Sequence, residues 1–321
     1  MNELTFHALE TERDWQEAID LRNAFLLTDP LLVEEVRTRG SQHPKEANLR
    51  RYVVRQDEKA VAYGTILQAY WLDDPTRYEI LTYARVSDDL TTYFRETVEF
   101  LIERAREHNA KTIGTHAPNH FDGIEQVLHS LGFHETQRNP VSALMLEEFD
   151  PSPFEATERE VSSKGFEIVS LEILKQRQPE TWMEEAWKLE MDLMSDVPLP
   201  RPFQGIPFDT FKQQLLDPHS HLSSMFVAVK DGVWAGLSQI HPNRVDAKFA
   251  MTGLTGVRRQ FRRQKLATAL KVHALRWAKQ SGIERIGTDN EENNPMLQLN
   301  VQLGFKKESD LVVMEKPLGQ P

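Results

Sequence analysis

The sequence predicts two copies of one mixed α/β domain of the α+β type, each with a sheet backed by helices. The chain has 321 residues, about the length of two ordinary domains. The triplet Ile-Gly-Thr at 113–115 recurs at 286–288, and Leu-Gly-Phe at 131–133 recurs at 303–305. Both matches keep nearly the same offset, which chance matches rarely do. Strand and helix patterns also alternate in each half, as in an α+β fold.

The repeat divides the chain into a first domain at 1–149, a linker at 150–164 and a second domain at 165–321. The linker segment is polar and contains Pro151 and Pro153, which is typical of a connector. The two copies are therefore expected to have separate cores.

The second copy has the clearer element pattern. A helix is predicted over 181–194, because apolar residues recur there at helical spacing, and the prolines of 197–200 end it. Strands at 225–229 and 233–240 flank a Lys-Asp-Gly turn and predict a hairpin. A third strand is predicted over 249–257.

A long helix is then predicted over 264–280. Its apolar stripe should be buried, and Lys271, Arg276 and Lys279 are expected on its solvent face. Gly282 fits the left-handed residue that follows a helix.

Three further elements complete the second copy. A short strand is predicted at 283–288. The last helix should begin at Asn294 and Pro295, which are favourable at the N-cap and in the first turn. A final strand is predicted at 305–314.

Composition excludes several classes of protein. The formal net charge of −11 disfavours general nucleic-acid binding. The chain has no cysteine, so disulfides, thiolate metal sites and cysteine nucleophiles are excluded. No stretch approaches a membrane span, and the first residues lack a secretory pattern. We therefore expect a cytoplasmic protein without metal, membrane or nucleic-acid partners.

One segment is strongly basic within this acidic chain. Residues 257–271 contain no acidic residue and carry the basic residues Arg258, Arg259, Arg262, Arg263, Lys265 and Lys271. The segment joins a predicted strand to the start of a helix, where unpaired backbone N–H groups and the helix dipole attract anions. It is either a phosphate site or a solvated basic helix face.

Two spaced patterns follow one another in the second copy. They are Arg262-x-x-Lys265-x-Ala267, after the strand that ends at Val257, and Asn293-x-x-Met296-x-x-x-Asn300-x-x-x-Gly304-Phe305. They resemble the acetyl-CoA loop and the following helix of the GNAT N-acetyltransferase superfamily, Arg/Gln-x-x-Gly-x-Gly/Ala and Asn-x-x-Ala-x-x-x-Tyr-x-x-x-Gly-Phe. The repeat then suggests a tandem-GNAT protein, with a mostly antiparallel central sheet flanked by helices in each domain.

The resemblance implies acetyl-CoA as co-substrate and assigns residues to it. In the family, the loop binds the CoA pyrophosphate, the strand end pairs with the pantetheine arm and the asparagine contacts that arm. The implied cofactor-binding residues are Thr255, Gly256, Val257, Arg258, Arg259, Arg262, Arg263, Gln264, Lys265, Leu266, Ala267, Thr268, Asn293, Met296 and Asn300. Lys271 is a further candidate for phosphate contact.

The resemblance also directs attention to catalytic groups. Direct acetyl transfer requires a base for the amine and an acid for the leaving thiolate. Glu190 and Asp196, beside the proline-bounded loop, are candidates for the base. Asn300 stands where the family has the tyrosine that protonates the thiolate; an amide can hold a thiolate by a hydrogen bond but cannot supply a proton near neutral pH. Lys265 stands where the family has a glycine. A residue with a side chain adopts a positive φ less easily than glycine does.

The first copy departs further from the family patterns. Val86 aligns with Val257, and the phosphate-loop segment 87–93 contains Asp88 and Asp89 and no basic residue. Carboxylates repel phosphate, so this domain is expected not to bind CoA in the usual way.

The sequence thus predicts an N-acetyltransferase that acts on a small-molecule amine, and a homodimer is possible. Two alternatives remain open: a non-catalytic acyl-CoA-binding or regulatory module, and an acyltransferase that acts on a peptide or protein amine.

Overall fold

The computed structural model describes residues 3–26, 29–199, 201–217 and 220–319. They form two compact units, the first made of residues up to 140 and from 309 on, the second of residues 141–308. Strand β6 (His134–Met145) begins in the first unit and ends in the second, whereas β12 (Lys306–Pro317) does the opposite. The unit boundaries therefore differ from the segments predicted above, because each of these long strands supplies residues to both units.

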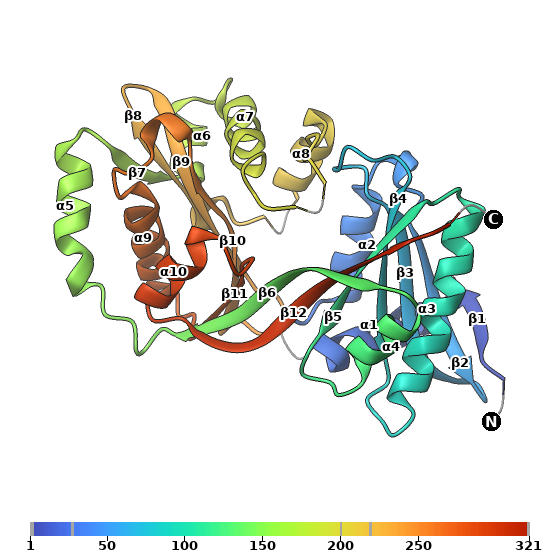
Figure 1. The fold of residues 1–321 in the computed structure, drawn as a ribbon. Helices are drawn as coiled ribbons and strands as arrows, with labels where there is room; N and C mark the ends of the chain where they lie inside the picture. Colours follow the sequence, from blue (N-terminus) through green and yellow to red (C-terminus); the bar gives the residue numbers. More distant parts are fainter. Residues whose placement is uncertain (1–2, 27–28, 200, 218–219, 320–321) are drawn as a thin grey trace. The chain divides into compact units, whose positions relative to one another are not determined.

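The first unit is a sheet with helices on both faces (Figure 1). Its strand order is β1-β2-β3-β4-β5-β12-β6; β4 and β5 are parallel, whereas the pairs β1–β2, β2–β3, β3–β4 and β5–β12 are antiparallel. Its remaining elements are β1 (Thr5–Ala8), α1 (Glu12–Leu26), α2 (Val33–Ser41), β2 (Arg50–Gln56), β3 (Lys59–Gln68), β4 (Arg77–Ala84), α3 (Leu90–Glu107), β5 (Thr112–Pro118) and α4 (Ile124–Ser130).

Side chains of this sheet alternate between two cores, because successive residues of a strand point to opposite faces. Val53 and Tyr63 pack in the core under α1 and α2. Val54 and Ala62 pack in the core under α3 and α4.

The second unit has the strand order β6-β11-β10-β9-β8-β7. Strands β10 and β11 are parallel, and the other neighbouring pairs are antiparallel. Its elements are α5 (Glu155–Ser163), β7 (Glu167–Ser170), α6 (Leu171–Arg177), α7 (Trp182–Met194), α8 (Phe208–Leu215), β8 (Met225–Lys230), β9 (Val233–Pro242), β10 (Phe249–Val257), α9 (Leu266–Gln280), β11 (Arg285–Asp289) and α10 (Pro295–Gln302). The predicted fold class of mostly antiparallel sheets flanked by helices is confirmed.

The same alternation separates two cores in the second unit. Phe226 and Ala228 of β8 pack with α9, while Met225 and Val227 pack with α6, α7 and α8. The helices that follow β10 and β11 therefore lie on one face of the sheet and α7 on the other.

Most of the second-copy elements lie where the pattern predicts them. Asn294 is the N-cap of α10, and its side chain accepts a hydrogen bond from the backbone N–H of Met296 at 3.0 Å. Gly282 has φ 84° after α9, as expected for a residue that follows a helix. Helices α6 and α8 lie outside the predicted elements, because each is only about two turns long and such short helices give a weak sequence signal.

Two expectations need correction. Lys271 was expected on the solvent face of α9, but it is only 5 % exposed and lies among the apolar residues of that helix. The segment 150–164, predicted as a linker, contains α5, which packs on α9. Val161 is buried and Glu158 bonds to Arg276 at 2.7 Å, so one side of this polar segment is fixed to the second unit.

Candidate functional site

The two parallel strands of the second unit separate after a short stretch of pairing. β10 pairs with β11 only from Phe249 to Met251, yet it continues along β9 as far as Val257. In the described part of the unit, residues 252–257 therefore have a strand partner on one side only. Residues 251–256 are partly exposed, unlike the two residues before them. The open edge can accept an extended ligand as an added strand.

A β-bulge interrupts β10 at this open edge. Its register against β9 shifts between Thr252 and Thr255. Leu254 compensates by donating its backbone N–H to Oε1 of Gln239 at 3.1 Å. Gly253 allows this close approach, since a Cβ would lie 2.3 Å from Nε2 of His241 and the imidazole would have to move. The bulge brings the polar side chains of β9 against the backbone of β10.

Glu190 of α7 joins this polar cluster. Nε2 of Gln239 donates to Oε2 of Glu190 at 2.9 Å, so one glutamine links the carboxylate to the bulge. Burial raises the pKa of Glu190 above its usual range, and the single hydrogen bond from Gln239 only partly opposes this. A carboxylate with a raised pKa is suited to proton transfer near neutral pH.

The predicted phosphate loop joins β10 to α9 through a short 3-10 turn at Arg259–Phe261. Arg258 donates from its guanidinium to the carbonyl of Trp234 at 2.8 Å, and Arg262 donates to the carbonyl of Val257 at 3.0 Å. Arg263 and Lys265 have positive φ, 61° and 63°. Lys265 thus adopts the backbone conformation of the family's glycine, at a cost of about 1 kcal/mol or more.

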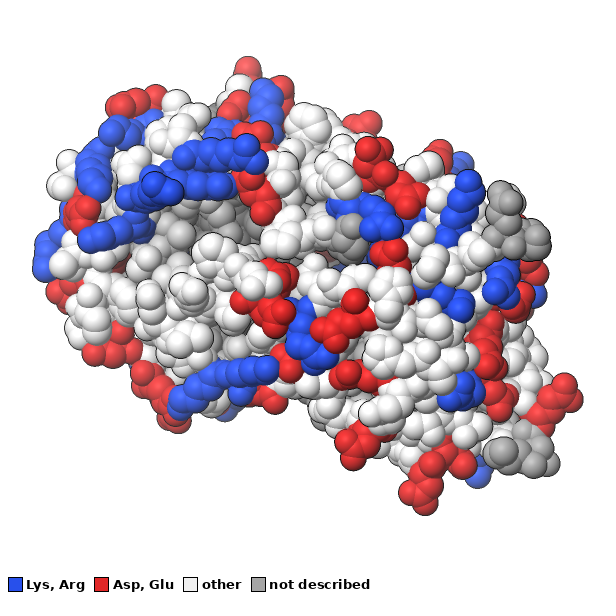
Figure 2. All heavy atoms as spheres, in the orientation of Figure 1, with Lys and Arg blue, Asp and Glu red and all other residues white. Residues whose placement is uncertain are grey.

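Acidic side chains of the same unit neutralise this loop. Asp196 accepts hydrogen bonds from Arg259 at 2.6 Å and from Arg262, and Asp192 accepts one from Arg258 at 2.9 Å. Lys265 bonds to Glu160 of α5 at 2.7 Å. Figure 2 shows the Lys and Arg side chains of the second unit gathered in a band beside a hollow, with acidic atoms at its margin. An incoming anion would have to compete with these carboxylates.

Asp196 is consequently a counter-ion of the loop. The hydrogen bond from Arg259 holds the pKa of Asp196 below its usual range; partial burial opposes this, and Arg262 adds to it. A carboxylate engaged by two guanidinium groups is a poor proton acceptor. The structure therefore separates the two candidate bases, with Glu190 at the bulge and Asp196 on the loop arginines.

The second predicted pattern lies on α10 and the turn before it. Asn293 is exposed, and its side chain donates to Glu291 at 2.7 Å. Asn300 is 0 % exposed and donates its Nδ2 to Oδ1 of Asn290. Its Oδ1 is buried and has no hydrogen-bond partner in the structure. Met296 is partly buried near the start of α10.

A model of the acetyltransferase (GNAT) family matches residues 182–305. This segment is a GNAT-family domain. The match contains β10, the loop, α9, β11 and α10, together with Glu190 and Asp196. It confirms the resemblance inferred from the two spaced patterns. A search of curated proteins gave no match.

Solved structures show that the tandem GNAT fold extends over the whole chain. A tandem GNAT protein from the clavulanic acid biosynthesis pathway has a TM-score of 0.73 and 18% identity, covering 99% of this chain and 100% of that one. A GCN5-related N-acetyltransferase from Sphaerobacter thermophilus has a TM-score of 0.68 and 17% identity, covering 98% and 95%. The glucosamine N-acetyltransferase region of a fungal GH3 β-N-acetylglucosaminidase has a TM-score of 0.70 and 12% identity, and the match covers 98% of this chain and 38% of that chain. At these identities the likeness is one of fold.

In the first unit, β4 and β5 also separate after a short stretch of pairing, but β4 has no β-bulge. β4 pairs with β5 only from Arg77 to Glu79, whereas its register against β3 is unbroken. The hairpin register places Ala84, not Val86, where the GNAT domain has Val257, because Ala84 pairs with Ala62 as Val257 pairs with Gly236. The connection to the next helix is therefore shorter, 85–89 against 258–265.

Aromatic side chains fill the region beside β4 in the first unit. Phe25 lies 4.9 Å from Phe121, 6.0 Å from Tyr83 and 6.2 Å from Phe94, measured between ring centroids. Burial raises the pKa of Tyr83 to about 12. The phosphate-loop position holds the exposed Asp88 and Asp89. That the first unit does not bind CoA in the usual way stays a prediction.

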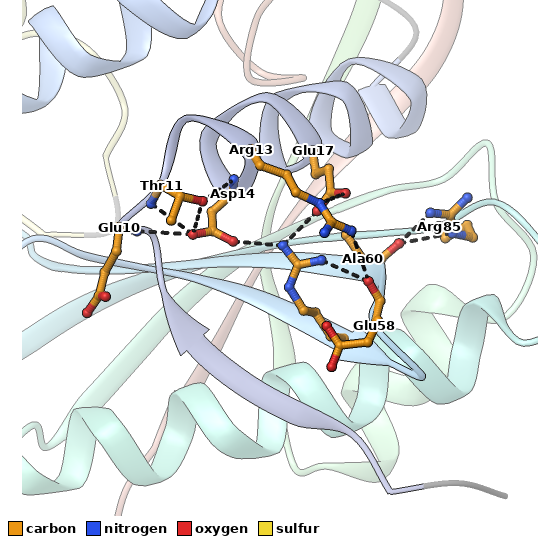
Figure 3. A network of polar contacts seen from close by, with 9 residues as sticks. Glu10, Thr11, Arg13, Asp14, Glu17, Glu58, Ala60 and Arg85 are labelled. Carbon is orange, nitrogen blue, oxygen red and sulfur yellow. Dashed lines mark hydrogen bonds and ion pairs between the residues drawn. The ribbon is translucent and has the colours of Figure 1, made fainter.

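The polar network of α1 in the first unit is also internally satisfied (Figure 3). Arg55 bonds to Asp14 and Glu17, each at 2.7 Å, and so ties α1 to β2. Burial opposes ionisation of Asp14, but hydrogen bonds from Thr11 and Arg55 outweigh it and hold the pKa of Asp14 below its usual range. Arg85 donates to the carbonyl of Ala60 and so resembles Arg258 in the GNAT domain. The network acts as a structural brace.

The described residues contain no group of three or more His, Asp or Glu side chains that could hold a metal ion. None of their helices combines the length and apolar character that a bilayer crossing requires.

Proposed function

We propose that the protein is an acetyl-CoA-dependent N-acetyltransferase that transfers an acetyl group directly to a small-molecule amine. The observation that carries the proposal is Glu190, a carboxylate with a raised pKa, linked through Gln239 to the bulge at the open edge of β10. The base, the strand edge and the basic loop all belong to one GNAT-family domain. The GNAT fold supports acyl transfer in general, and this cluster favours an amine acceptor.

Three parts of the domain fit acetyl-CoA. The unpaired edge at Thr255, Gly256 and Val257 matches the amide groups of the pantetheine arm. The loop at 258–265 and the first turn of α9 offer backbone N–H groups and the positive end of the helix to the pyrophosphate. Ala267 and Thr268 are small, so phosphate can approach this turn.

In the proposed reaction the acceptor amine and the thioester meet beside the bulge. Glu190 removes a proton from the ammonium form of the amine, and the neutral amine attacks the acetyl carbonyl. The negative charge of ionised Glu190 attracts a cationic amine. The chain's net charge of −11 favours a small amine over nucleic acid as acceptor.

Titration with acetyl-CoA tests the placement of the co-substrate. We expect calorimetry to give one site per chain, because the first unit lacks the bulge and the basic loop. Arg262→Glu should abolish that binding, since it places a carboxylate at the phosphate loop. Two sites in the wild type, or unchanged affinity in the variant, would contradict the assignment.

Asp196→Asn distinguishes the loop counter-ion from a base. We expect acetyl-CoA binding to be retained or strengthened by a few-fold, about 0.5–1 kcal/mol, because a competitor for Arg259 and Arg262 is weakened. Turnover should persist. If the variant instead loses turnover while it still binds acetyl-CoA, Asp196 is the base and Glu190 is not.

A second candidate function is a non-catalytic acyl-CoA-binding module. The observation that favours it is Asn300, which is buried where the family has its proton-donating tyrosine. Acetyl-CoA binding without acetylation of any amine in a broad panel would support this function.

Acetylation of peptide amines but not small amines would support a peptide acyltransferase.

A further inference from the structure

Lys271 is the one residue of the α9 core whose charge the fold leaves uncompensated. The residue is 5 % exposed and lies on a face of α9 that is otherwise apolar. Among the residues that the structure describes, it forms no salt bridge and no hydrogen bond. Its ammonium contacts an aromatic ring instead: Nζ lies 5.5 Å from the ring centroid of Phe305. A buried ammonium without an anion is costly, so a purely structural role predicts an apolar residue here.

The backbone of Phe305 is hydrogen-bonded to Asn300. The backbone N–H of Phe305 donates to the carbonyl of Asn300 at 3.0 Å. Asn300 also carries a buried Oδ1 without a hydrogen-bond partner. One residue, Phe305, thus contacts the unpaired ammonium and is hydrogen-bonded to the residue that replaces the family's tyrosine.

Lys271 and Asn300 are neighbours through Phe305, which contacts both of them. Helices α9 and α10 follow parallel strands, so both begin at the same end of the sheet. The open edge of β10 lies at this end of the sheet, which puts the side chains of Lys271 and Asn300 beside the path proposed for the pantetheine arm.

We propose that Lys271 is the proton donor for the CoA thiolate and so compensates for the tyrosine that Asn300 replaces. This proposal rests on the proposed acetyl transfer. The nitrogen of the tetrahedral intermediate releases its remaining extra proton to water. When the intermediate then collapses, the C–S bond breaks and its electron pair moves to sulfur. A proton then passes from Nζ of Lys271 to that sulfur, which yields CoA thiol and a neutral lysine. Water restores the proton to the lysine before the next turnover.

The acidity of Lys271 suits this role. Burial alone lowers its pKa to about 8, so the ammonium is largely protonated at neutral pH yet acidic enough to protonate a thiolate. The lysine must be protonated to act, so the rate should fall as pH rises through about 8.

Other titratable groups near α9 do not account for this behaviour. Strand β10, helix α10 and the short turns packed on α9 contain no titratable side chain. The titratable groups of α5, β8 and β9 are the acids Glu155, Glu158 and Glu160, Arg159, Lys230 and His241. Glu158 pairs with Arg276, Glu160 with Lys164 and Lys265, and Glu155 with Arg159. Lys230 lies over the ring of Phe166, and His241 lies beside Gly253.

The test measures the ionisation of the CoA thiol bound to the full-length protein, through the ultraviolet absorbance of the thiolate. In the wild type, the ammonium beside the sulfur should make the thiolate appear at lower pH than in free CoA. Lys271→Met should remove this shift, whereas Lys279→Met, on the exposed end of the same helix, should keep it. Lys271→Met removes a buried charge and keeps the length of the side chain, so it should fold.

Steady-state rates give a second readout. Lys271→Met should lower kcat about 100-fold with little change in KM, and should remove the fall in rate above pH 8. An unchanged thiol titration in Lys271→Met would overturn the proposal. A lysine-dependent shift in the thiol titration without acetylation of any amine would leave Lys271 beside the sulfur but overturn its role as donor, and the proposed acetyl transfer would then fail separately.

Discussion

Glu190→Gln should abolish most acetyl transfer while leaving the protein folded and able to bind acetyl-CoA. Glutamine retains the shape and can still bond to Gln239, but it cannot accept the proton of the ammonium. General-base catalysis contributes about 100- to 10,000-fold, and kcat should fall by that amount. Calorimetry with acetyl-CoA should give an affinity close to that of the wild type.

The pH profile supplies an independent check on Glu190. A base must be deprotonated, so the wild-type rate should fall as pH decreases through the raised pKa of Glu190. This limb should be absent in Glu190→Gln. Glu184→Gln is the matched control, because Glu184 lies on the same helix but is exposed and pairs with Lys188. Wild-type kcat in Glu190→Gln would remove Glu190 as the base.

Arg77→Met should strongly destabilise the first unit. Arg77 is 0 % exposed, bonds to Glu79 at 2.8 Å and also bonds to Glu315 of β12. Loss of the guanidinium leaves two carboxylates buried together, and breaking such a pair costs about 3–5 kcal/mol. Gly114 lies against this cluster with no room for a side chain, so the carboxylates have little space to rearrange.

Denaturant unfolding of the full chain measures this loss. The triple variant Arg77→Met with Glu79→Gln and Glu315→Gln should recover much of the stability, since it removes the buried like charges. Arg106→Ala is the matched control; its pair with Glu103 is exposed, so its loss should cost about 1 kcal/mol or less. Equal effects of Arg77→Met and Arg106→Ala would show that the buried cluster does not fix β12 to the first unit.

Local sequence patterns were enough to identify the GNAT domain and to predict most elements of the second copy. Helical periodicity predicted α7, and the Asn294-Pro295 pair marked the start of α10 because capping is a local interaction. The basic loop was recognised because its spacing on a strand–helix junction survives the loss of the family's glycine at Lys265. Local rules suffice where neighbours in sequence make the deciding contacts.

Which polar groups face one another depends on contacts between residues that are far apart in the sequence. Asp196 and Glu190 look alike in sequence, but one meets Arg259 and Arg262 across the fold and the other meets Gln239 at the bulge. Lys271 was expected in solvent, because periodicity does not show how wide a face a helix buries. The exchange of β6 and β12 between units was also beyond prediction, since strand pairing joins residues far apart in the chain. Contacts of that kind fix pKa values and partners, and no local pattern encodes them.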